Sequence, residues 1–299
     1  MSYRAGFVGL IGLPNSGKST VMNAMVGEKV SIVTAKPQTT RRRSMGLVSS
    51  ENAQIVFVDA PGIVRASAGL NRFLREEAVD VIAQSDVLLA VLNIDERKFE
   101  DLDEVLAMVR ESGKPWMALI HKTDLGSPHR VQILRTKLSD DKVAVIQGSA
   151  LADPKGVKEL ILEHVEKMMP LAEKPLYDEE LYTLSNTRDI CAEIVREKCF
   201  EKLHQEVPFG LAVRILKFIE DDGDVIKVHA EILVSKDNHR PIVIGRGGEV
   251  LKAIGTEARK EMETLTGQRI FLDLNVASKK NWQRNPGMLK DLGYVVPRA

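Results

Sequence analysis

The 299-residue chain lacks the features that would place it in a special structural class. Its only cysteines, Cys191 and Cys199, are too few for a disulfide framework and do not have CxxC metal-site spacing. No apolar run approaches the roughly 18 residues that a membrane-spanning helix needs, and the N-terminus has no signal-peptide pattern. Lys and Arg number 42, as do Asp and Glu, which excludes nucleic-acid binding by bulk charge but permits a local basic patch. We expect a cytoplasmic protein with at most peripheral membrane contact.

What is present is an ordinary globular composition, with 44% hydrophobic and 28% charged residues. Up to about residue 170, short apolar runs alternate with helical patterns. This alternation predicts an α/β domain with a mostly parallel sheet covered on both faces. Ligands of such sheets bind beyond the carboxyl ends of the strands. The predicted strands are 7–11, 55–58, 87–92, 116–120 and 143–146, and the predicted helices are 20–26, 103–111, 130–138 and 155–169.

After residue 170 the pattern changes. Pro170 and Pro175 bracket a linker at 171–180, which separates a domain at 1–170 from one at 181–299. The second domain is predicted to be a smaller α+β domain, because helices and strands no longer alternate regularly. Its predicted elements are a helix at 188–205, strands at 211–219 and 225–234 joined by a turn at 221–224, an apolar segment at 241–244, a helix at 250–264 and a strand at 269–276.

A glycine-rich turn follows the first predicted strand. Residues Gly12 to Ser19 match G-x-x-x-x-G-K-[ST] between a strand and a helix, the context that this phosphate-binding motif requires. Backbone N–H groups and the helix N-terminus would bind phosphate oxygens. Lys18 would lie near the β- and γ-phosphates, and the Ser19 hydroxyl could bind Mg²⁺.

Asp59-Ala60-Pro61-Gly62 follows the strand at 55–58. An acid at this strand end could hold Mg²⁺ through water, and the Gly62 N–H could contact a γ-phosphate and report its presence. By itself this tetrapeptide is more often an ordinary turn. Its position beside the phosphate-binding loop favours a functional role.

His121-Lys122-Thr123-Asp124 follows the strand at 116–120. The Asp124 carboxylate could accept both donors on the guanine edge, whereas adenine would leave it poorly paired. The Lys122 stem could lie along the base, and the segment with Ser149 and Ala150 could close the pocket with backbone donors. The alternative is an ordinary polar loop.

In this order the motifs resemble the translation-factor-related class of P-loop GTPases, over residues 5 to 170. The resemblance implies a switch-loop threonine that binds Mg²⁺, with Thr40 the first candidate and Thr39 the second. The class has Asn or Thr where this chain has His121, while Lys122 and Asp124 are retained. The Asn15 side chain resembles the asparagine that marks potassium-stimulated members, which implies a K⁺ ion at the site.

Hydrolysis by the isolated protein is expected to be slow. Ile63 stands where a Ras-like switch carries the glutamine that orients the attacking water, and it has no polar group. Catalysis would rest on the loop, Mg²⁺ and positioning. A pure RNA-binding module that holds GTP without useful turnover therefore stays an alternative. An ATP-dependent kinase is a further one, against which Asp124 argues.

Gly245-Arg246-Gly247-Gly248 precedes the helix at 250–264 and forms a G-x-x-G loop. Such a loop brings the backbone close to a sugar–phosphate chain, although alone it can be an ordinary helix-start turn. The order of elements resembles a type II KH domain, which binds single-stranded RNA. From residue 172 onward the chain has 20 basic and 21 acidic residues, so RNA binding would need a one-sided basic face.

A P-loop GTPase domain followed by a KH domain resembles the Era family of bacterial GTPases, over nearly the whole chain. The resemblance implies a GTP-regulated factor for assembly of the small (30S) ribosomal subunit, which binds the 3′ end of the small-subunit rRNA. It also implies a cytoplasmic protein found peripherally at the inner membrane. With no exposed heptad evident, we expect a monomer.

These readings define three predicted sets of residues. The nucleotide-binding set is Gly12, Leu13, Pro14, Asn15, Ser16, Gly17, Lys18, Ser19, Thr20, Asp59, Ala60, Pro61, Gly62, His121, Lys122, Asp124, Ser149 and Ala150; within it and the switch loop, Asn15, Lys18, Thr39, Thr40 and Gly62 are the catalytic or switch residues, and Ser19, Thr40 and Asp59 are the metal ligands. The RNA-binding set is Gly245, Arg246, Gly247, Gly248, Lys252, Arg259 and Lys260.

Overall fold

The computed structural model describes residues 3–34, 36, 39–63, 68–220 and 225–294. The chain divides into two compact units, one built mainly from residues up to 184 and the other mainly from residue 185 onward. The turn expected at 221–224 lies outside the described residues. No helix in the described ranges has the length and apolarity needed to cross a membrane.

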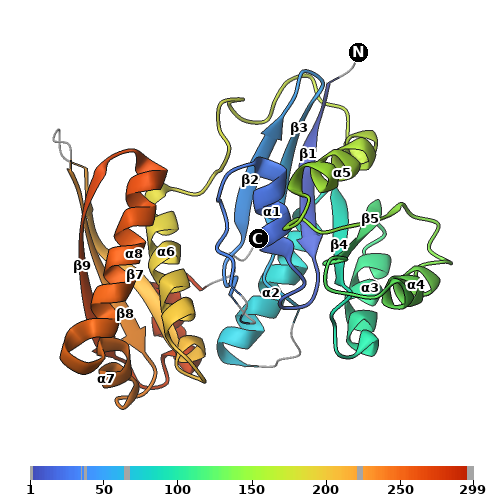
Figure 1. Cartoon of the computed structure of the whole chain (residues 1–299). Helices are drawn as coiled ribbons and strands as arrows, with labels where there is room; N and C mark the ends of the chain where they lie inside the picture. Colours follow the sequence, from blue (N-terminus) through green and yellow to red (C-terminus); the bar gives the residue numbers. More distant parts are fainter. Residues whose placement is uncertain (1–2, 35, 37–38, 64–67, 221–224, 295–299) are drawn as a thin grey trace. The chain divides into compact units, whose positions relative to one another are not determined.

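The first unit is an α/β unit around a six-stranded sheet (Figure 1). The strand order is β2-β3-β1-β4-β5-β6, and only β2 runs antiparallel to its neighbour. The elements are β1 (Arg4–Ile11), α1 (Lys18–Val26), β2 (Ser44–Ser49), β3 (Ala53–Asp59), α2 (Gly69–Gln84), β4 (Val87–Asn93), α3 (Leu102–Glu111), β5 (Trp116–His121), α4 (Pro128–Lys137), β6 (Val145–Gly148) and α5 (Pro154–Met168).

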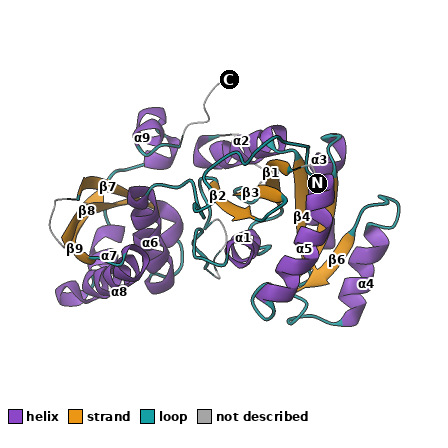
Figure 2. Cartoon of the chain, turned by 90° about the horizontal axis from the view of Figure 1, so that it is seen from above, coloured by secondary structure: helices purple, strands orange, loops and turns teal. Residues whose placement is uncertain are grey.

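Helices cover both faces of this sheet, which explains the continuous apolar strands. One face packs against α1 and α5, with Leu10 and Phe57 at its centre. The other packs against α2, α3 and α4, with Leu88 and Leu92 at its centre. Figure 2 shows the sheet between these layers. The carboxyl ends of β1, β3, β5 and β6 therefore open at one end of the sheet, where the predicted motifs lie.

The second unit is an α+β unit with a three-stranded sheet in the order β7-β8-β9. β7 and β8 are antiparallel, and β8 and β9 are parallel. Its elements are α6 (Thr187–Lys202), β7 (Leu211–Ile219), β8 (Val225–Val234), α7 (His239–Ile244), α8 (Glu249–Thr266), β9 (Arg269–Ser278) and α9 (Pro286–Asp291).

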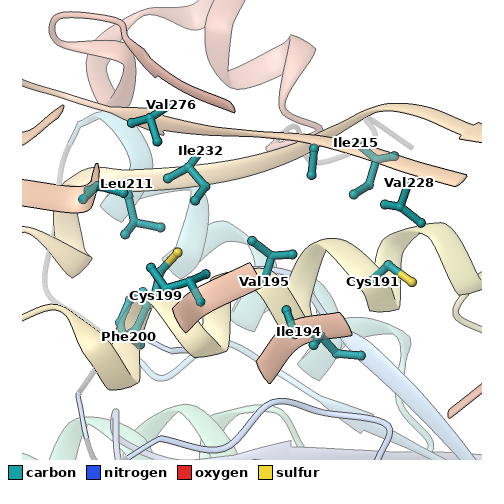
Figure 3. Packing of buried hydrophobic residues seen from close by; sticks show 14 of the residues in the cluster. Cys191, Ile194, Val195, Cys199, Phe200, Leu211, Ile215, Val228, Ile232 and Val276 are labelled. Atoms are coloured by element: carbon teal, nitrogen blue, oxygen red, sulfur yellow. The ribbon is translucent and has the colours of Figure 1, made fainter. Parts of the chain in front are cut away.

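The core of the second unit lies between its sheet and the helices α6 and α8. Figure 3 shows Cys191 and Val195 of α6 facing sheet residues such as Ile232. Both cysteines are fully buried, and burial raises the pKa of the Cys191 and Cys199 thiols to about 12. Their role is packing in this core.

Most predicted elements are present within a few residues of their expected bounds, and 211–219 and 225–234 coincide with β7 and β8. The sequence reading missed β2 and α2. β2 is an antiparallel edge strand without a continuous apolar run, and only Gly46 and Leu47 within it are buried. The predicted strand at 143–146 lies two residues later, because Val145 is the first residue paired with β5. The apolar segment at 241–244 is part of helix α7.

Candidate nucleotide site and RNA-binding surface

The predicted phosphate-binding loop joins β1 to α1. Lys18, the first residue of α1, is 5% exposed, and its Nζ donates to the carbonyl oxygens of Leu13 at 2.9 Å and Gly12 at 3.2 Å. Burial lowers the pKa of Lys18 to about 8, while the Asp59 carboxylate acts in the opposite direction. The loop thus holds a cationic group inside a curve of backbone, an arrangement suited to phosphate oxygens.

Three oxygen-bearing side chains meet beside this loop. The Ser19 hydroxyl donates to Asp59 Oδ2 at 2.6 Å and lies 2.9 Å from Thr40 Oγ1. Thr40 Oγ1 also lies 3.5 Å from Asp59 Oδ2. The register pairs Leu10 of β1 with Asp59 of β3, which brings the carboxylate next to the loop. Residues 40 positions apart in sequence therefore form one oxygen cluster.

This cluster fits a magnesium ion. Asp59 is fully buried, and its Oδ1 has no hydrogen-bond partner. Burial raises the pKa of Asp59, whereas Lys18, Ser19 and Thr40 act in the opposite direction. Among the residues that the structure describes, no three His, Cys, Asp or Glu side chains gather at one point. Mg²⁺ needs no such group, since it is commonly bound by one or two carboxylates with hydroxyls, waters and phosphate oxygens.

Gly62 packs directly against the phosphate-binding loop. A Cβ at this position would lie 2.4 Å from the backbone N of Pro14, so a larger residue would displace the loop. The next residue, Ile63, donates its N–H to the Gly12 carbonyl at 3.1 Å and is 3% exposed. The segment after β3 is thus held against the loop by backbone contacts.

The predicted guanine-binding segment follows β5. Lys122 has a positive φ of 60°, and its Nζ donates to the carbonyl of Asn15 in the phosphate-binding loop at 2.8 Å. Its stem therefore spans from one motif to the other. Asp124 is exposed, as a carboxylate that receives a base must be. Ser149 and Ala150 are buried in the adjoining loop, whose position follows from the pairing of β5 with β6.

The two candidate threonines, Thr39 and Thr40, lie between α1 and β2 and have different partners. Thr40 joins the oxygen cluster, whereas Thr39 Oγ1 donates to the Lys36 carbonyl at 2.7 Å and lies 2.7 Å from Thr34 Oγ1. The Thr39 hydroxyl thus forms hydrogen bonds within its own loop. The geometry favours Thr40 as the metal-facing residue.

The three arginines after Thr40 do not form an exposed run. Arg41 is 2% exposed. Arg43 pairs with Glu77 of α2 at 3.0 Å, with Asp80 and with Gln84. Arg43 therefore attaches the chain just before β2 to helix α2.

In the second unit, the G-x-x-G loop joins α7 to α8. Gly245, Gly247 and Gly248 all have positive φ, at 76°, 60° and 83°, which explains the glycines. Arg246 is exposed within the loop. The structure therefore presents a cation on a turn whose glycines leave the backbone open to a sugar–phosphate chain.

The predicted basic residues Lys252, Arg259 and Lys260 are exposed on α8, away from the buried Ile254, Ala258 and Met262. Their helix places them on the side opposite the core.

Two of the acids that could oppose RNA have internal partners. Glu261 pairs with Lys198 at 2.8 Å, and Glu263 Oε1 accepts from the Ile270 N–H at 3.2 Å. These contacts hold two negative charges within the unit. In a unit with nearly equal numbers of acidic and basic residues, this helps to leave a basic surface for RNA.

The structure also contains a contact that the sequence reading missed. Residues 182–184, just before the second unit, pair along β2: Leu47 N–H donates to the Tyr182 carbonyl at 2.9 Å, and Thr183 Oγ1 donates to the Met45 carbonyl at 2.7 Å. The buried Gln54 amide bonds both backbone groups of Tyr177. A glutamine in an otherwise apolar strand was the signal in the sequence.

The C-terminal segment around Trp282 is packed within the second unit. Trp282 is fully buried, donates its indole N–H to the Gly210 carbonyl at 2.9 Å and stacks on Tyr294. Its side chain is not available to a membrane. Val295, which follows Tyr294, lies outside the described residues.

The first unit combines a phosphate-binding loop, an oxygen cluster and a base-binding segment, which together define a P-loop GTPase. The second unit has a G-x-x-G turn before a helix, which defines a KH domain. Family models agree: residues 7–122 match the family described as "50S ribosome-binding GTPase", and residues 206–283 match the KH domain.

The chain belongs to the GTPase Era family. It is 38% identical to GTPase Era of Syntrophus aciditrophicus over 296 residues, covering 98% of this chain and 95% of the relative. It is 39% identical to GTPase Era of Nitratidesulfovibrio vulgaris over 303 residues, covering 98% and 97%.

Two solved Era structures have the same fold over nearly the whole chain. A variant of Aquifex aeolicus Era bound to GDP and AlF₄⁻ has a TM-score of 0.90 with 31% identity, covering 98% of this chain and all of that one. An Era complex with MgGDPNP and nucleotides 1506–1542 of 16S ribosomal RNA has a TM-score of 0.89, again with 31% identity and the same coverage.

Proposed function

We propose that this chain binds and hydrolyses GTP to control its association with the 3′ end of 16S ribosomal RNA during assembly of the small ribosomal subunit. The observation that carries the proposal is the meeting of Ser19, Thr40 and Asp59 beside the phosphate-binding loop. The Era complex with MgGDPNP and 16S rRNA supports both ligand classes.

In this proposal each part of the nucleotide has its own residues. Lys18 and the backbone from Gly12 to Gly17 bind the phosphates, and Lys122 with Asp124 selects guanine. Ser19 and Thr40 hold Mg²⁺, with Asp59 beside them. The ion, when bound, neutralises charge that develops on the phosphate oxygens.

Slow intrinsic hydrolysis follows from what lies after Gly62. Ile63 is apolar and buried, so it cannot orient a water. We propose that a K⁺ ion adds positive charge at the phosphates and so assists hydrolysis, with Asn15 in the phosphate-binding loop as its protein contact. Exchange of K⁺ for Na⁺ then lowers turnover, and equal rates in both salts would exclude a potassium site.

RNA binding is assigned to the second unit. The exposed Arg246 in the G-x-x-G loop and the exposed Lys252, Arg259 and Lys260 on α8 supply phosphate contacts. The loop contacts the sugar–phosphate backbone, and base contacts supply any sequence preference.

Nucleotide control is proposed to pass through β2. This strand begins shortly after Thr40, and the segment that leads to the KH domain is hydrogen-bonded along it. A change at Thr40 on loss of the γ-phosphate would therefore reach residues 182–184 through one strand.

The remaining assignments follow from the same proposal. The GTPase domain comprises residues 1–170 and the KH domain 181–299, with 171–180 as the linker. The protein acts as a monomer in the cytoplasm, on the 30S subunit, and any inner-membrane contact is peripheral.

A single experiment tests the core of the proposal. GTP and ATP hydrolysis are measured in Mg²⁺, with K⁺ or Na⁺, with and without an RNA oligonucleotide of the 16S 3′ end. The proposal requires GTP-specific turnover and RNA binding that differs between GDP and a non-hydrolysable GTP analogue. Binding of RNA with no GTP turnover in any condition would favour an RNA-binding module that holds GTP structurally, which the apolar Ile63 would explain.

A further inference from the structure

His121 is a buried imidazole that bridges two loops of the nucleotide site. It is the last residue of β5 and is 2% exposed. Its Nδ1 lies 3.0 Å from the Ser16 carbonyl in the phosphate-binding loop, and its Nε2 lies 3.1 Å from the Ala150 backbone nitrogen in the loop after β6. One side chain thus joins the loop that faces phosphate to the loop that faces the base.

These two contacts require one protonation state. The Ala150 N–H can only donate, so Nε2 must carry a lone pair. The Ser16 carbonyl can only accept, so Nδ1 must carry the proton. Only the neutral Nδ1–H tautomer satisfies both partners. An added proton on Nε2 would face the Ala150 N–H and break that bond.

The imidazole has little room to escape this conflict. A Cβ on Gly17 would lie 2.4 Å from His121 Nδ1, so the ring is packed against the phosphate-binding loop itself. A protonated ring would therefore have to separate from Ala150, from Ser16 or from both.

The surroundings of His121 also disfavour its charged form. Burial lowers the pKa of His121, the Ser16 carbonyl opposes this, Lys122 lowers it further and Asp124 raises it. A folded-state pKa below the ordinary value means that the native contacts are fully present at neutral pH. They are lost as the pH falls through the folded-state pKa of His121, which lies below the ordinary histidine value of about 6.5.

We propose that neutral His121 is a positioning residue that ties the phosphate-binding loop to the base-closing loop, and that its protonation weakens guanine-nucleotide binding in acid. This inference rests on the proposed nucleotide site and adds to it a pH dependence that the Asn or Thr of the related motif cannot have. An amide or a hydroxyl does not titrate in this range.

The decisive comparison uses the full-length protein and the variants His121→Asn and His121→Ala. The dissociation constant for fluorescent GDP in Mg²⁺ is measured at about pH 7.5 and about pH 4.5, the second well below the ordinary histidine pKa because the folded-state pKa of His121 is lowered. Protonation of GDP itself is common to all three proteins and cancels in the comparison. The wild-type affinity should fall about tenfold more than that of H121N, as expected for loss of one or two buried hydrogen bonds. H121A should bind more weakly at both pH values without the extra fall.

A second measurement needs no nucleotide, and comparison with H121N identifies the His121 signals among those of the six histidines. Nitrogen-15 NMR of the imidazole should show the Nδ1–H tautomer at neutral pH, with titration below about 6.5. An Nε2–H tautomer, or equal pH dependence of wild type and H121N, would overturn the inference while leaving GTP binding intact. Absence of saturable GDP binding by the wild type at neutral pH would instead overturn the proposed function, and the NMR titration would still test His121.

Discussion

The two candidate sites of this chain are built in opposite ways. Around the phosphate-binding loop, the polar groups Lys18 and Asp59 are nearly inaccessible to solvent, and each is held by hydrogen bonds, Lys18 to the Leu13 carbonyl and Asp59 to the Ser19 hydroxyl. At the G-x-x-G loop, Arg246 and Lys252 are exposed. A preorganised, desolvated site gains large effects from each group, whereas an exposed cationic surface acts through summed, salt-screened contacts. Single substitutions should therefore matter far more in the first site than in the second.

The largest effect is expected from Lys18→Ala. Removal of the buried ammonium takes away the point charge on the phosphates, and GTP turnover should fall about 100-fold or more. Steady-state phosphate release measures it. Lys155→Ala, at an exposed lysine in the first turn of α5, is the matched control and should change the rate little. A Lys18 variant with normal turnover would show that this loop is not the phosphate site.

A change of base preference is expected from Asp124→Asn. The amide cannot accept both guanine donors, so GTP affinity should fall about 100-fold, the value of two charge-assisted hydrogen bonds. Xanthine has a carbonyl where guanine has an amino group, so the amide can donate to it and XTP should bind better than GTP. Competition binding with both nucleotides measures this. An unchanged preference for GTP would remove Asp124 from the base site.

The same contrast explains how much the sequence could predict. Polar groups that bind a nucleotide need fixed spacing and strand context, so the phosphate-binding loop, Asp59 and Asp124 could be predicted residue by residue. The exposed basic surface has no such constraint, and the sequence indicated it only through a short G-x-x-G motif and the order of its helices and strands. Near-neutral composition concealed it, because acids such as Glu261 have partners inside the unit.

Other contacts could not be predicted, because they depend on tertiary pairing rather than on local pattern. Gln54 was a polar residue in an otherwise apolar strand, but nothing in the sequence indicated that residues 182–184 would pair along β2, since β2 itself lacks a strong strand signal. The attachment of Arg43 to α2 was equally hidden: a run of arginines can be a solvated face, a ligand site or, as here, partly internal. His121 was identified as a departure from the related motif, but only the structure gives its two partners.

A moderate effect is expected from Arg246→Glu in the G-x-x-G loop. Charge reversal should weaken binding of the 16S 3′-end oligonucleotide about tenfold and reduce the salt slope by about 1. GTP turnover without RNA should stay unchanged. Lys290→Glu, the same charge reversal at an exposed position of α9, is the control. Equal loss of affinity in both variants would indicate a general charge effect rather than a binding loop.

The smallest effect is expected from Thr183→Val, a substitution that tests the coupling between the two sites. The substitution keeps the β-branched shape suited to strand pairing but removes the hydroxyl that donates to the Met45 carbonyl. One partly buried hydrogen bond contributes about 1 kcal/mol, so the difference in RNA affinity between the GDP and GTP-analogue states should shrink about two- to fivefold. Neither GTP turnover nor RNA affinity in the absence of nucleotide should change.

Thr187→Val at the start of α6 provides a threonine control, since it removes the same group from a position outside the β2 pairing. If Thr183→Val leaves the nucleotide dependence of RNA binding intact, control does not pass along β2. If it lowers turnover as strongly as RNA coupling, the segment supports the fold of the GTPase unit rather than the connection between the two sites.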